Sequence, residues 1–389
     1  MQRLQARHFR TLEPIELSIS DQQIQSIDSI SVTSNSDALP IIAPGFFDIQ
    51  INGYNGIWFS SPKLTIDDVA QVTRALVARG ITRYFPTLIT ASHEALRHGF
   101  ETLKQACEAD SLVNKVVAGY HLEGPYISAE DGPRGAHPLQ HVRPADFDEF
   151  QQLQEASGNR IRLVTLAAEA ENAASFITRC RESGVVVAIG HTGATPEQIR
   201  AAVDAGAQLS THFGNGAHGS LRRHPNYLWE QLASDRLWAS VIADGWHLPA
   251  SVLQCVLKCK GQDHTILTCD VSGFGGCPPG TYQEGDVPVE VLDDGRIVVA
   301  GQRQFLAGSG ATTGDCVVRM SAATEITLAD AVDMATANPA ALLNEELPQL
   351  EPGAAASFCL FTMQDTNAEF GQAQFLPQRT FVDGQEFLI

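Results

Sequence analysis

Residues 185–197 read VVVAIGHTGATPE and combine an apolar strand, a histidine and the start of a helix. The run 185–189 is apolar at every position, as expected of a parallel strand that is covered on both faces. His191 follows this run after one glycine, and the Thr195-Pro196-Glu197 sequence is typical of a helix start. The segment therefore predicts one unit of strand, polar side chain and helix.

The same pattern recurs along the middle of the chain. Counted from Ile41, it predicts eight strands, at residues 41–52, 84–88, 116–120, 161–166, 185–189, 207–210, 239–243 and 265–268. Helical patterns separate most of them, such as the one that begins at Thr65 with Asp68 as capping partner. Eight such units in series predict an α/β protein with a (β/α)₈ TIM-like barrel. Frequent glycine and proline between Val271 and Gly310 predict an extended loop or hairpin after the last strand.

Both ends of the chain are rich in short β patterns. Residues 1 to about 40 show no helical period, and the stretch from about Leu350 is similar. We therefore predict a small β-sandwich domain formed from both chain termini, residues 1–43 and 346–389, around a barrel domain over residues 44–345.

Composition excludes several classes of partner. The chain has 389 residues with 45 acidic and 26 basic side chains, a net charge of −19, which repels nucleic acid and anionic membranes. No apolar stretch is long enough to span a bilayer, and the first residues lack the apolar core of a signal peptide. The eight cysteines form no CxxC pair. They are interpreted as reduced thiols of a cytoplasmic protein. The charge predicts that neither nucleic acid nor a membrane is a partner.

Polar side chains fall where predicted strands end. In chain order these are Gln50 and Asn52, Glu123, His191, His212, His247 and Asp270. The carboxyl ends of barrel strands meet at one face, so we expect these side chains to converge.

Each of these residues has a structural alternative when taken alone. A lone histidine at a strand end is more often a hydrogen-bonded core residue than a ligand, and a lone acid is more often a helix cap. The joint pattern is more informative. Two imidazoles and a carboxylate, from Glu123, His191 and His212, match a zinc site that leaves one position open for water. A free aspartate nearby, Asp270, would supply the base.

Several motifs carry a resemblance to a known family. They are PGFFDIQING at 44–53, HLEGP at 121–125, GHT at 190–192, TH at 211–212, ADGWH at 243–247 and Asp270. In order and spacing they resemble N-acetylglucosamine-6-phosphate deacetylases of the amidohydrolase superfamily. The resemblance runs through nearly the whole chain, and the combination is specific although each piece is weak.

The resemblance implies that Glu123, His191 and His212 hold one divalent metal ion, with zinc favoured and iron, manganese or cobalt left open. Many amidohydrolases bind a further metal through a His-x-His pair. Gln50 and Asn52 stand in its place, and neutral amides are poor zinc ligands, so a single metal is expected. Gln50 would contact the water that attacks the substrate, and its alternative is a structural hydrogen bond.

The resemblance also implies catalytic roles. Asp270 would accept the proton of the attacking water and return it to the departing amine. His137 would polarise the acetamide carbonyl together with the metal, and His247 would bind the substrate. The alternatives are a solvated loop histidine for His137 and a structural loop contact for His247.

The segment NGAHGSLRRHP at 215–225 is read, by the same resemblance, as the loop that binds the sugar phosphate. Asn215, the backbone near Gly216 and Arg223 would provide the contacts. In the family this arginine can come from a neighbouring subunit, which implies a homodimer. The alternative is a flexible solvated loop. Residues 213–217 and 307–310 depart from the family pattern, so the substrate is less well defined than the metal chemistry.

The expected function is therefore hydrolysis of the acetamide of an N-acetylated amino sugar 6-phosphate. Hydrolysis of another N-acyl amino sugar or of an N-acyl amino acid is the alternative. Dihydroorotase-like binuclear chemistry is disfavoured by Gln50 and Asn52. A sugar-phosphate sensor without catalysis is disfavoured because Asp270 and all the metal ligands are present.

Overall fold

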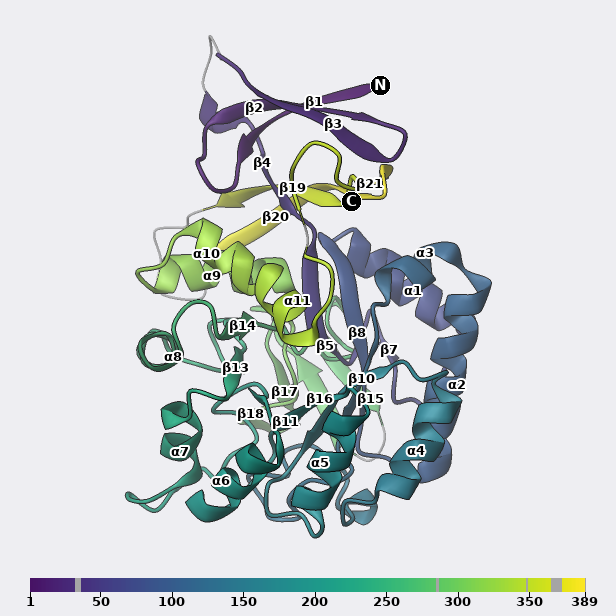
Figure 1. Cartoon of the computed structure of the whole chain (residues 1–389), viewed down its shortest axis with the longest axis vertical. Helices are drawn as coiled ribbons and strands as arrows, with labels where there is room; N and C mark the ends of the chain where they lie inside the picture. The colour runs from purple at the N-terminus through teal and green to yellow at the C-terminus, as the bar shows by residue number, and fades with distance from the viewer. Residues whose placement is uncertain (32–35, 285–286, 348, 365–372, 389) are drawn as a thin grey trace.

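A parallel eight-stranded barrel occupies the middle of the chain in the computed structural model, which describes residues 1–31, 36–284, 287–347, 349–364 and 373–388 (Figure 1). Its strands are β5 (Phe46–Ile51), β8 (Ile81–Ile89), β9 (Tyr120–Glu123), β10 (Ile161–Leu166), β11 (Val186–Ile189), β12 (Leu209–Ser210), β13 (Trp238–Val241) and β14 (Thr265–Leu267). They pair side by side in chain order from β5 to β14. This confirms the predicted fold class.

The barrel closes between its two end strands, β5 and β14. Ile51 and Val271 form an isolated parallel bridge there, and the amide of Asn52 donates to the carbonyl of Val271 at 3.0 Å. The fully buried carboxylate of Asp48 adds a bond from the Thr268 hydroxyl at 2.6 Å. Side-chain bonds therefore supplement a short backbone ladder at this closure.

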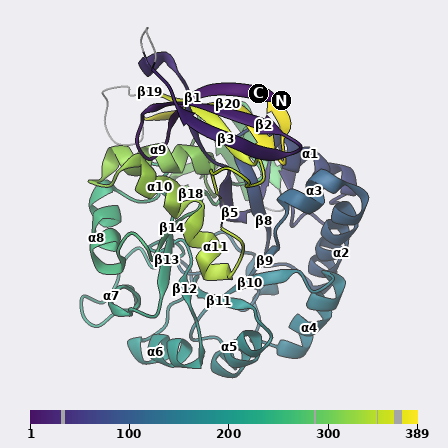
Figure 2. The ribbon, with the colours of Figure 1, turned by 45° about the horizontal axis from the view of Figure 1, so that its top comes forward.

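Helices surround the strands. They are α1 (Ile66–Val77), α2 (His93–Ala109), α3 (Ser111–Val116), α4 (Phe147–Ala156), α5 (Ala173–Glu182), α6 (Pro196–Ala205), α7 (Tyr227–Ala233), α8 (Ala250–Lys260), α9 (Thr313–Ala323), α10 (Leu328–Met334) and α11 (Ala337–Leu343), with 3₁₀ turns at Ser36–Ala38 and Leu139–His141. Figure 2 shows α2, α4, α5, α6, α7 and α8 ranged around the barrel. The predicted helix starts are confirmed, because Thr65 and Thr195 each form a capping box.

Two strand predictions were partly wrong. Residue 116 ends helix α3, which Asp110 caps through the amides of Leu112 and Val113, and strand β9 begins only at Tyr120. An apolar run such as 116–120 does not distinguish the end of a buried helix from a strand. Glu123 is consequently the last residue of β9 instead of following it. Residues 41–44 form β4 (Ile41–Pro44), which belongs to a different sheet.

That different sheet joins the two ends of the chain. Its strands are β1 (Gln2–His8), β2 (Pro14–Ser20), β3 (Gln23–Ser29), β4, β19 (Phe358–Gln364), β20 (Gln374–Val382) and β21 (Gln385–Leu388), in the order β21-β20-β19-β4-β1-β2-β3. A separate apolar core contains residues from both chain ends, such as Leu17 of β2 and Phe358 of β19. The pairing of β4 with β1 is parallel, and β4 leads directly into barrel strand β5 (Figure 1).

The domain boundaries at 43/44 and 345/346 stay a prediction. Residues 32–35, 285–286, 348, 365–372 and 389 of the predicted domains lie outside the described residues.

The glycine- and proline-rich segment after β14 forms more than a loop. It contains an antiparallel sheet of β15 (Gly280–Glu284), β16 (Val287–Val291), β17 (Ile297–Val299) and β18 (Gln302–Leu306). A two-stranded ribbon, β6 (Gly53–Tyr54) with β7 (Ile57–Trp58), follows β5. The inserted sheet has its own apolar cluster around Phe274 and Ile297, and the Arg296 guanidinium lies 4.6 Å from the ring centre of Trp246. The predicted hairpin was therefore too small.

Within the described part of the chain, no helix has both the length and the apolar character needed to cross a bilayer.

The link between β4 and β5 gives a stability prediction. A Cβ on Gly45 would lie 2.1 Å from Cγ2 of Thr82, a buried β-branched side chain with little freedom to move. We expect Gly45→Ala to lower the free energy of unfolding by roughly 1–3 kcal/mol, measured by urea denaturation. Gly219→Ala is the control, because a Cβ there meets no atom within 4 Å. Equal stability of the two variants would contradict this packing.

Candidate active site

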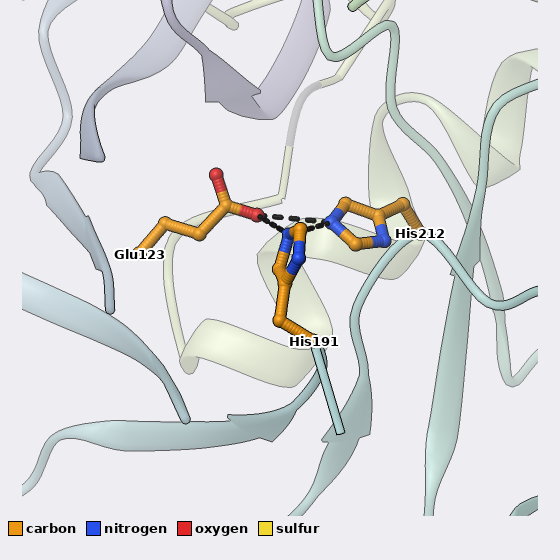
Figure 3. A group of neighbouring side chains, drawn as sticks. All are labelled: Glu123, His191 and His212. Carbon is orange, nitrogen blue, oxygen red and sulfur yellow. Dashed lines mark hydrogen bonds and ion pairs between the residues drawn. The ribbon is translucent and has the colours of Figure 1, made fainter. Parts of the chain in front are cut away.

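Three buried side chains meet at the carboxyl ends of barrel strands. Oε1 of Glu123 lies 3.2 Å from Nε2 of His191 and 2.9 Å from Nε2 of His212, and the two Nε2 atoms lie 3.0 Å apart (Figure 3). Glu123 ends β9, while His191 and His212 follow β11 and β12 after one intervening residue each. The structure therefore brings together the three residues that the sequence predicted as metal ligands.

This geometry fits a divalent metal ion. Ligand atoms about 2.0–2.1 Å from a tetrahedral zinc ion lie roughly 3.3 Å from one another, close to the spacing of these three atoms. Nδ1 of His191 lies 2.9 Å from the carbonyl oxygen of Pro133, to which it donates, so its Nε2 is left as an acceptor. Of the His, Cys, Asp and Glu clusters in the described residues, this is the one with metal-binding spacing.

The side chains of this cluster shift one another's pKa values. Burial acts to raise the pKa of Glu123, but the hydrogen bonds and charges of His191 and His212 hold that pKa well below its usual range. Burial acts to lower the pKa of His212, but the hydrogen bond with Glu123 and the charges of Glu123 and Asp270 together raise it. The cluster therefore favours positive charge on His212 beside the Glu123 carboxylate, in the place where a cation would bring it.

The backbone is strained at three of these positions. His191, His212 and Asp270 have φ values of 50°, 29° and 48°, a region that side chains other than glycine rarely adopt. Each follows a barrel strand, and such strain, of order 1–3 kcal/mol per residue, is typical of functional sites. No feature of the sequence predicted this strain.

Asp270 is held by two side-chain amides. Its Oδ1 accepts hydrogen bonds from Nε2 of Gln50 at 3.0 Å and from Nδ2 of Asn52 at 2.7 Å. Nε2 of Gln50 also donates to Oε1 of Glu123 at 2.8 Å. Burial, followed by the nearby charge of Glu123, raises the pKa of Asp270 to about 6. These contacts match the structural alternative for Gln50, and they identify Asn52 as a partner of Asp270 that the sequence analysis did not recognise.

His137 is buried beside the cluster instead of being a solvated loop histidine. Its ring centre lies 4.3 Å from that of His191. The Thr90 amide donates to its Nδ1 at 3.4 Å, and the Thr90 hydroxyl lies 2.8 Å from the same atom. Nδ1 is therefore an acceptor, and the proton of the neutral ring lies on Nε2. Burial, followed by the charge of His191, lowers the pKa of His137 to about 3, so the ring stays neutral.

His247 is oriented by a buried aspartate. Its Nδ1 lies 2.7 Å from Oδ2 of Asp244, which also accepts from the Ser309 hydroxyl at 3.2 Å. Burial acts to raise the pKa of Asp244, but the charge of His247 and the hydrogen bonds from His247 and Trp246 together lower it. The sequence motif contained Asp244, but nothing in the sequence alone assigned it this orienting contact.

The predicted phosphate loop lies next to the cluster of Glu123, His191 and His212. A Cβ on Gly216 would come within 2.7 Å of Nδ1 of His191, so the loop backbone packs directly on that ring. Nδ2 of Asn215 donates to the carbonyl of His212 at 3.1 Å. Arg222 and Arg223 are exposed, and no ion pair joins either of them to a carboxylate among the residues the structure describes. Asn215 and Gly216 are thus near the cluster, while the Arg223 side chain faces solvent.

A second contact fixes this loop, and the sequence analysis missed it. Nε2 of His218 lies 2.9 Å from Oε2 of Glu130, and its Nδ1 lies 3.0 Å from the Tyr227 hydroxyl. Glu130 belongs to the segment that carries Pro133 and His137, so this contact joins the two loops that flank His191.

Comparison with known proteins agrees with this arrangement. The family model described as "Amidohydrolase family" matches residues 41–387. An N-acetylgalactosamine-6-phosphate deacetylase of Escherichia coli O157:H7 is 31% identical over 361 residues, which cover 91% of this chain and 93% of that protein. A human N-acetylglucosamine-6-phosphate deacetylase is 33% identical over 329 residues, covering 82% of this chain and 78% of its own length.

A solved structure is also similar over the full length. A variant of the Mycobacterium smegmatis N-acetyl-D-glucosamine-6-phosphate deacetylase, in complex with N-acetyl-D-glucosamine-6-phosphate, superposes with a TM-score of 0.84 and 27% identity, covering 99% of each chain. The similarity therefore includes both the barrel and the sheet built from the chain ends.

The cluster leads to a prediction about metal binding. His191→Ala and His212→Ala each leave two protein ligands of three, so metal occupancy measured by elemental analysis should fall to a small fraction of the wild-type value. His264→Ala is the control, since that ring packs on Trp238 away from the cluster and should leave occupancy unchanged. Full occupancy in both ligand variants would rule out this site.

Proposed function

Because the chain belongs to the amidohydrolase family, we propose that it is a metal-dependent deacetylase of an N-acetylated amino sugar 6-phosphate. The reaction releases acetate and leaves the free amine, as in the conversion of N-acetylglucosamine 6-phosphate to glucosamine 6-phosphate. The observation that carries the proposal is the convergence of Glu123, His191 and His212 beside an aspartate held for proton transfer. The names of the two relatives described above, both amino sugar phosphate deacetylases, support the substrate class.

We propose zinc as the metal, held by Glu123, His191 and His212. Two imidazoles and one carboxylate are a ligand set of catalytic zinc sites, although iron, manganese and cobalt also accept it. When bound, such an ion supplies a Lewis acid that activates water and polarises the acetamide carbonyl.

Asp270 moves the proton in this proposal. Its Oδ1 is occupied by Gln50 and Asn52, so Oδ2 is the atom left to accept the proton of the attacking water. The same carboxyl then gives the proton to the nitrogen of the breaking C–N bond, because an amine anion is too poor a leaving group. A pKa of about 6 suits both the acceptance and the return of a proton near neutral pH.

His137 and His247 orient the substrate in this proposal. Neutral His137 carries its proton on Nε2 and can donate it to the carbonyl oxygen as negative charge develops there. Because Nδ1 of His247 is hydrogen-bonded to Asp244, Nε2 of His247 is left to bind the substrate. Gln50 contributes by holding Asp270 and Glu123 in their relative positions, whether or not it also contacts the attacking water.

We further propose that Asn215, the backbone at Gly216 and Arg223 bind the 6-phosphate. Arg223 is exposed and free of ion pairs within the described residues, so it is available to reach a phosphate in a neighbouring subunit. This favours a homodimer. A cytoplasmic location is a separate proposal, supported by the eight cysteines, which are all free thiols.

The substrate class is tested by measuring amine release from acetylated hexosamines with the metal-loaded protein. The arms are the gluco and galacto epimers, each with and without the 6-phosphate, together with an N-acetyl amino acid. We expect turnover of at least one phosphorylated epimer well above its free sugar. Turnover of the amino acid alone would replace this proposal with the general N-acyl hydrolase.

Asp270→Asn tests the proton-transfer role. The amide keeps the shape of the side chain but cannot accept or return the proton, so kcat should fall by at least ~10²-fold. Metal content should stay at the wild-type level, because Asp270 is not part of the ligand cluster. Near-normal turnover would exclude Asp270 as the base.

Arg223→Ala tests the phosphate contact. An arginine fork binds phosphate oxygens in a bidentate manner, so its loss should lower kcat/KM for the phosphorylated substrate by at least ~10-fold, with less effect on the free sugar. Arg222→Ala, which removes an adjacent exposed arginine, is the matched control and should have the smaller effect. Equal losses on phosphorylated and free sugars would contradict a phosphate role.

A further inference from the structure

The Asp48 carboxylate is fully buried and accepts four hydrogen bonds. Its Oδ1 accepts hydrogen bonds from the backbone amide of Gln50 at 2.9 Å and from the Thr268 hydroxyl at 2.6 Å. Its Oδ2 receives the Cys269 amide at 2.9 Å and the Thr313 hydroxyl at 2.6 Å. Neither oxygen has lone pairs to spare for a ligand, so the group is neither a base nor a metal site.

Neutral donors offset the cost of burying this group. Among the residues the structure describes, no ion pair joins Asp48 to a basic side chain. Thr313 is the first residue of the 11-residue helix α9, so the carboxylate lies at the positive end of a helix dipole. Such an arrangement holds the carboxylate in one position, because any displacement leaves a buried donor or the charge itself unsatisfied.

Two of the four donors, the backbone amides of Cys269 and Gln50, connect Asp48 to Asp270. Cys269 directly precedes Asp270, so its amide bond to Asp48 fixes the start of the turn in which Asp270 has a φ of 48°. The backbone amide of Gln50 also donates to Asp48, and the side-chain Nε2 of Gln50 donates to Oδ1 of Asp270. The backbone and one side-chain partner of Asp270 are therefore anchored on a single buried carboxylate.

We propose that Asp48 is a positioning residue that fixes the direction of the Asp270 carboxylate. This inference rests on the proposed proton-transfer role of Asp270. With Oδ1 of Asp270 held, Oδ2 is kept in the position from which it takes the proton of the attacking water. The closure between β5 and β14 thus both completes the barrel and aligns its base.

Asp48→Asn tests this directly. Whichever way the amide turns, its NH₂ group faces two donors, and either the Gln50 or the Cys269 amide loses its acceptor. We expect kcat to fall by at least ~10-fold while KM and metal content stay near wild type, since small displacements of catalytic groups lower the rate of the chemical step.

A milder pair of variants separates alignment from stability. Thr313→Val removes one donor without changing side-chain shape and should lower kcat less than Asp48→Asn does, while Thr313→Ser keeps the hydroxyl and should restore most of the turnover. Thr73→Val is the matched control, a buried threonine whose hydroxyl lies 2.9 Å from that of Tyr84, and it should leave kcat unchanged.

A crystal structure of Asp48→Asn gives a readout that is independent of activity. We expect the Asp270 carboxylate to lose its hydrogen bond to Gln50, to Asn52 or to both. The proposal is overturned if Asp270 keeps its wild-type position in this structure, or if both Asp48→Asn and Thr313→Val keep wild-type kcat. It is also overturned if Asp48→Asn loses metal in parallel with kcat. The proposed function fails by a different result, namely the absence of amine release by the wild-type protein.

Discussion

One oxygen atom, Oε1 of Glu123, is the point on which the site depends. Nitrogen atoms of Gln50, His191 and His212 lie within 3.2 Å of it, and they come from β5 and from the ends of β11 and β12. Its position is set by strand register, because Glu123 pairs with Ile89 of β8 and Thr165 of β10. A slip of one residue would turn the side chain to the other face of the barrel wall and disperse the cluster. Strained turns at His191 and His212 are the conformational cost of this convergence.

Most of the fold could be predicted from the sequence because local signals agree with it. Apolar runs such as 185–189 are long enough to indicate buried parallel strands, and Thr195-Pro196 marks a helix start without ambiguity. The errors occurred where local signals are degenerate. The run 116–120 is apolar whether it ends a helix or forms a strand, and the capping role of Asp110 distinguishes the two only once the backbone is known. The inserted sheet was underestimated because glycine and proline hide short strands.

The site was predictable to the extent that fold topology gathers strand ends. Glu123, His191, His212 and Asp270 follow from that rule together with residue type. Other features depend on distances that the sequence does not contain. They are the tautomer of His137, the orientation of His247 by Asp244 and the hydrogen bond from Asn52 to Asp270. Asp48 did carry a faint signal, since it is a carboxylate within the otherwise apolar run 46–49, but only its four buried donors show why it is there.

The inserted sheet leaves and rejoins the barrel at neighbouring points, because Val271 and Ser309 form a parallel bridge. A segment with adjacent attachment points can change in length or sequence without pulling on the residues before and after it. Its Arg296 meets Trp246, which directly precedes His247. The inserted sheet thus borders the proposed substrate site, and a change within it need not displace the residues that we propose to move the proton.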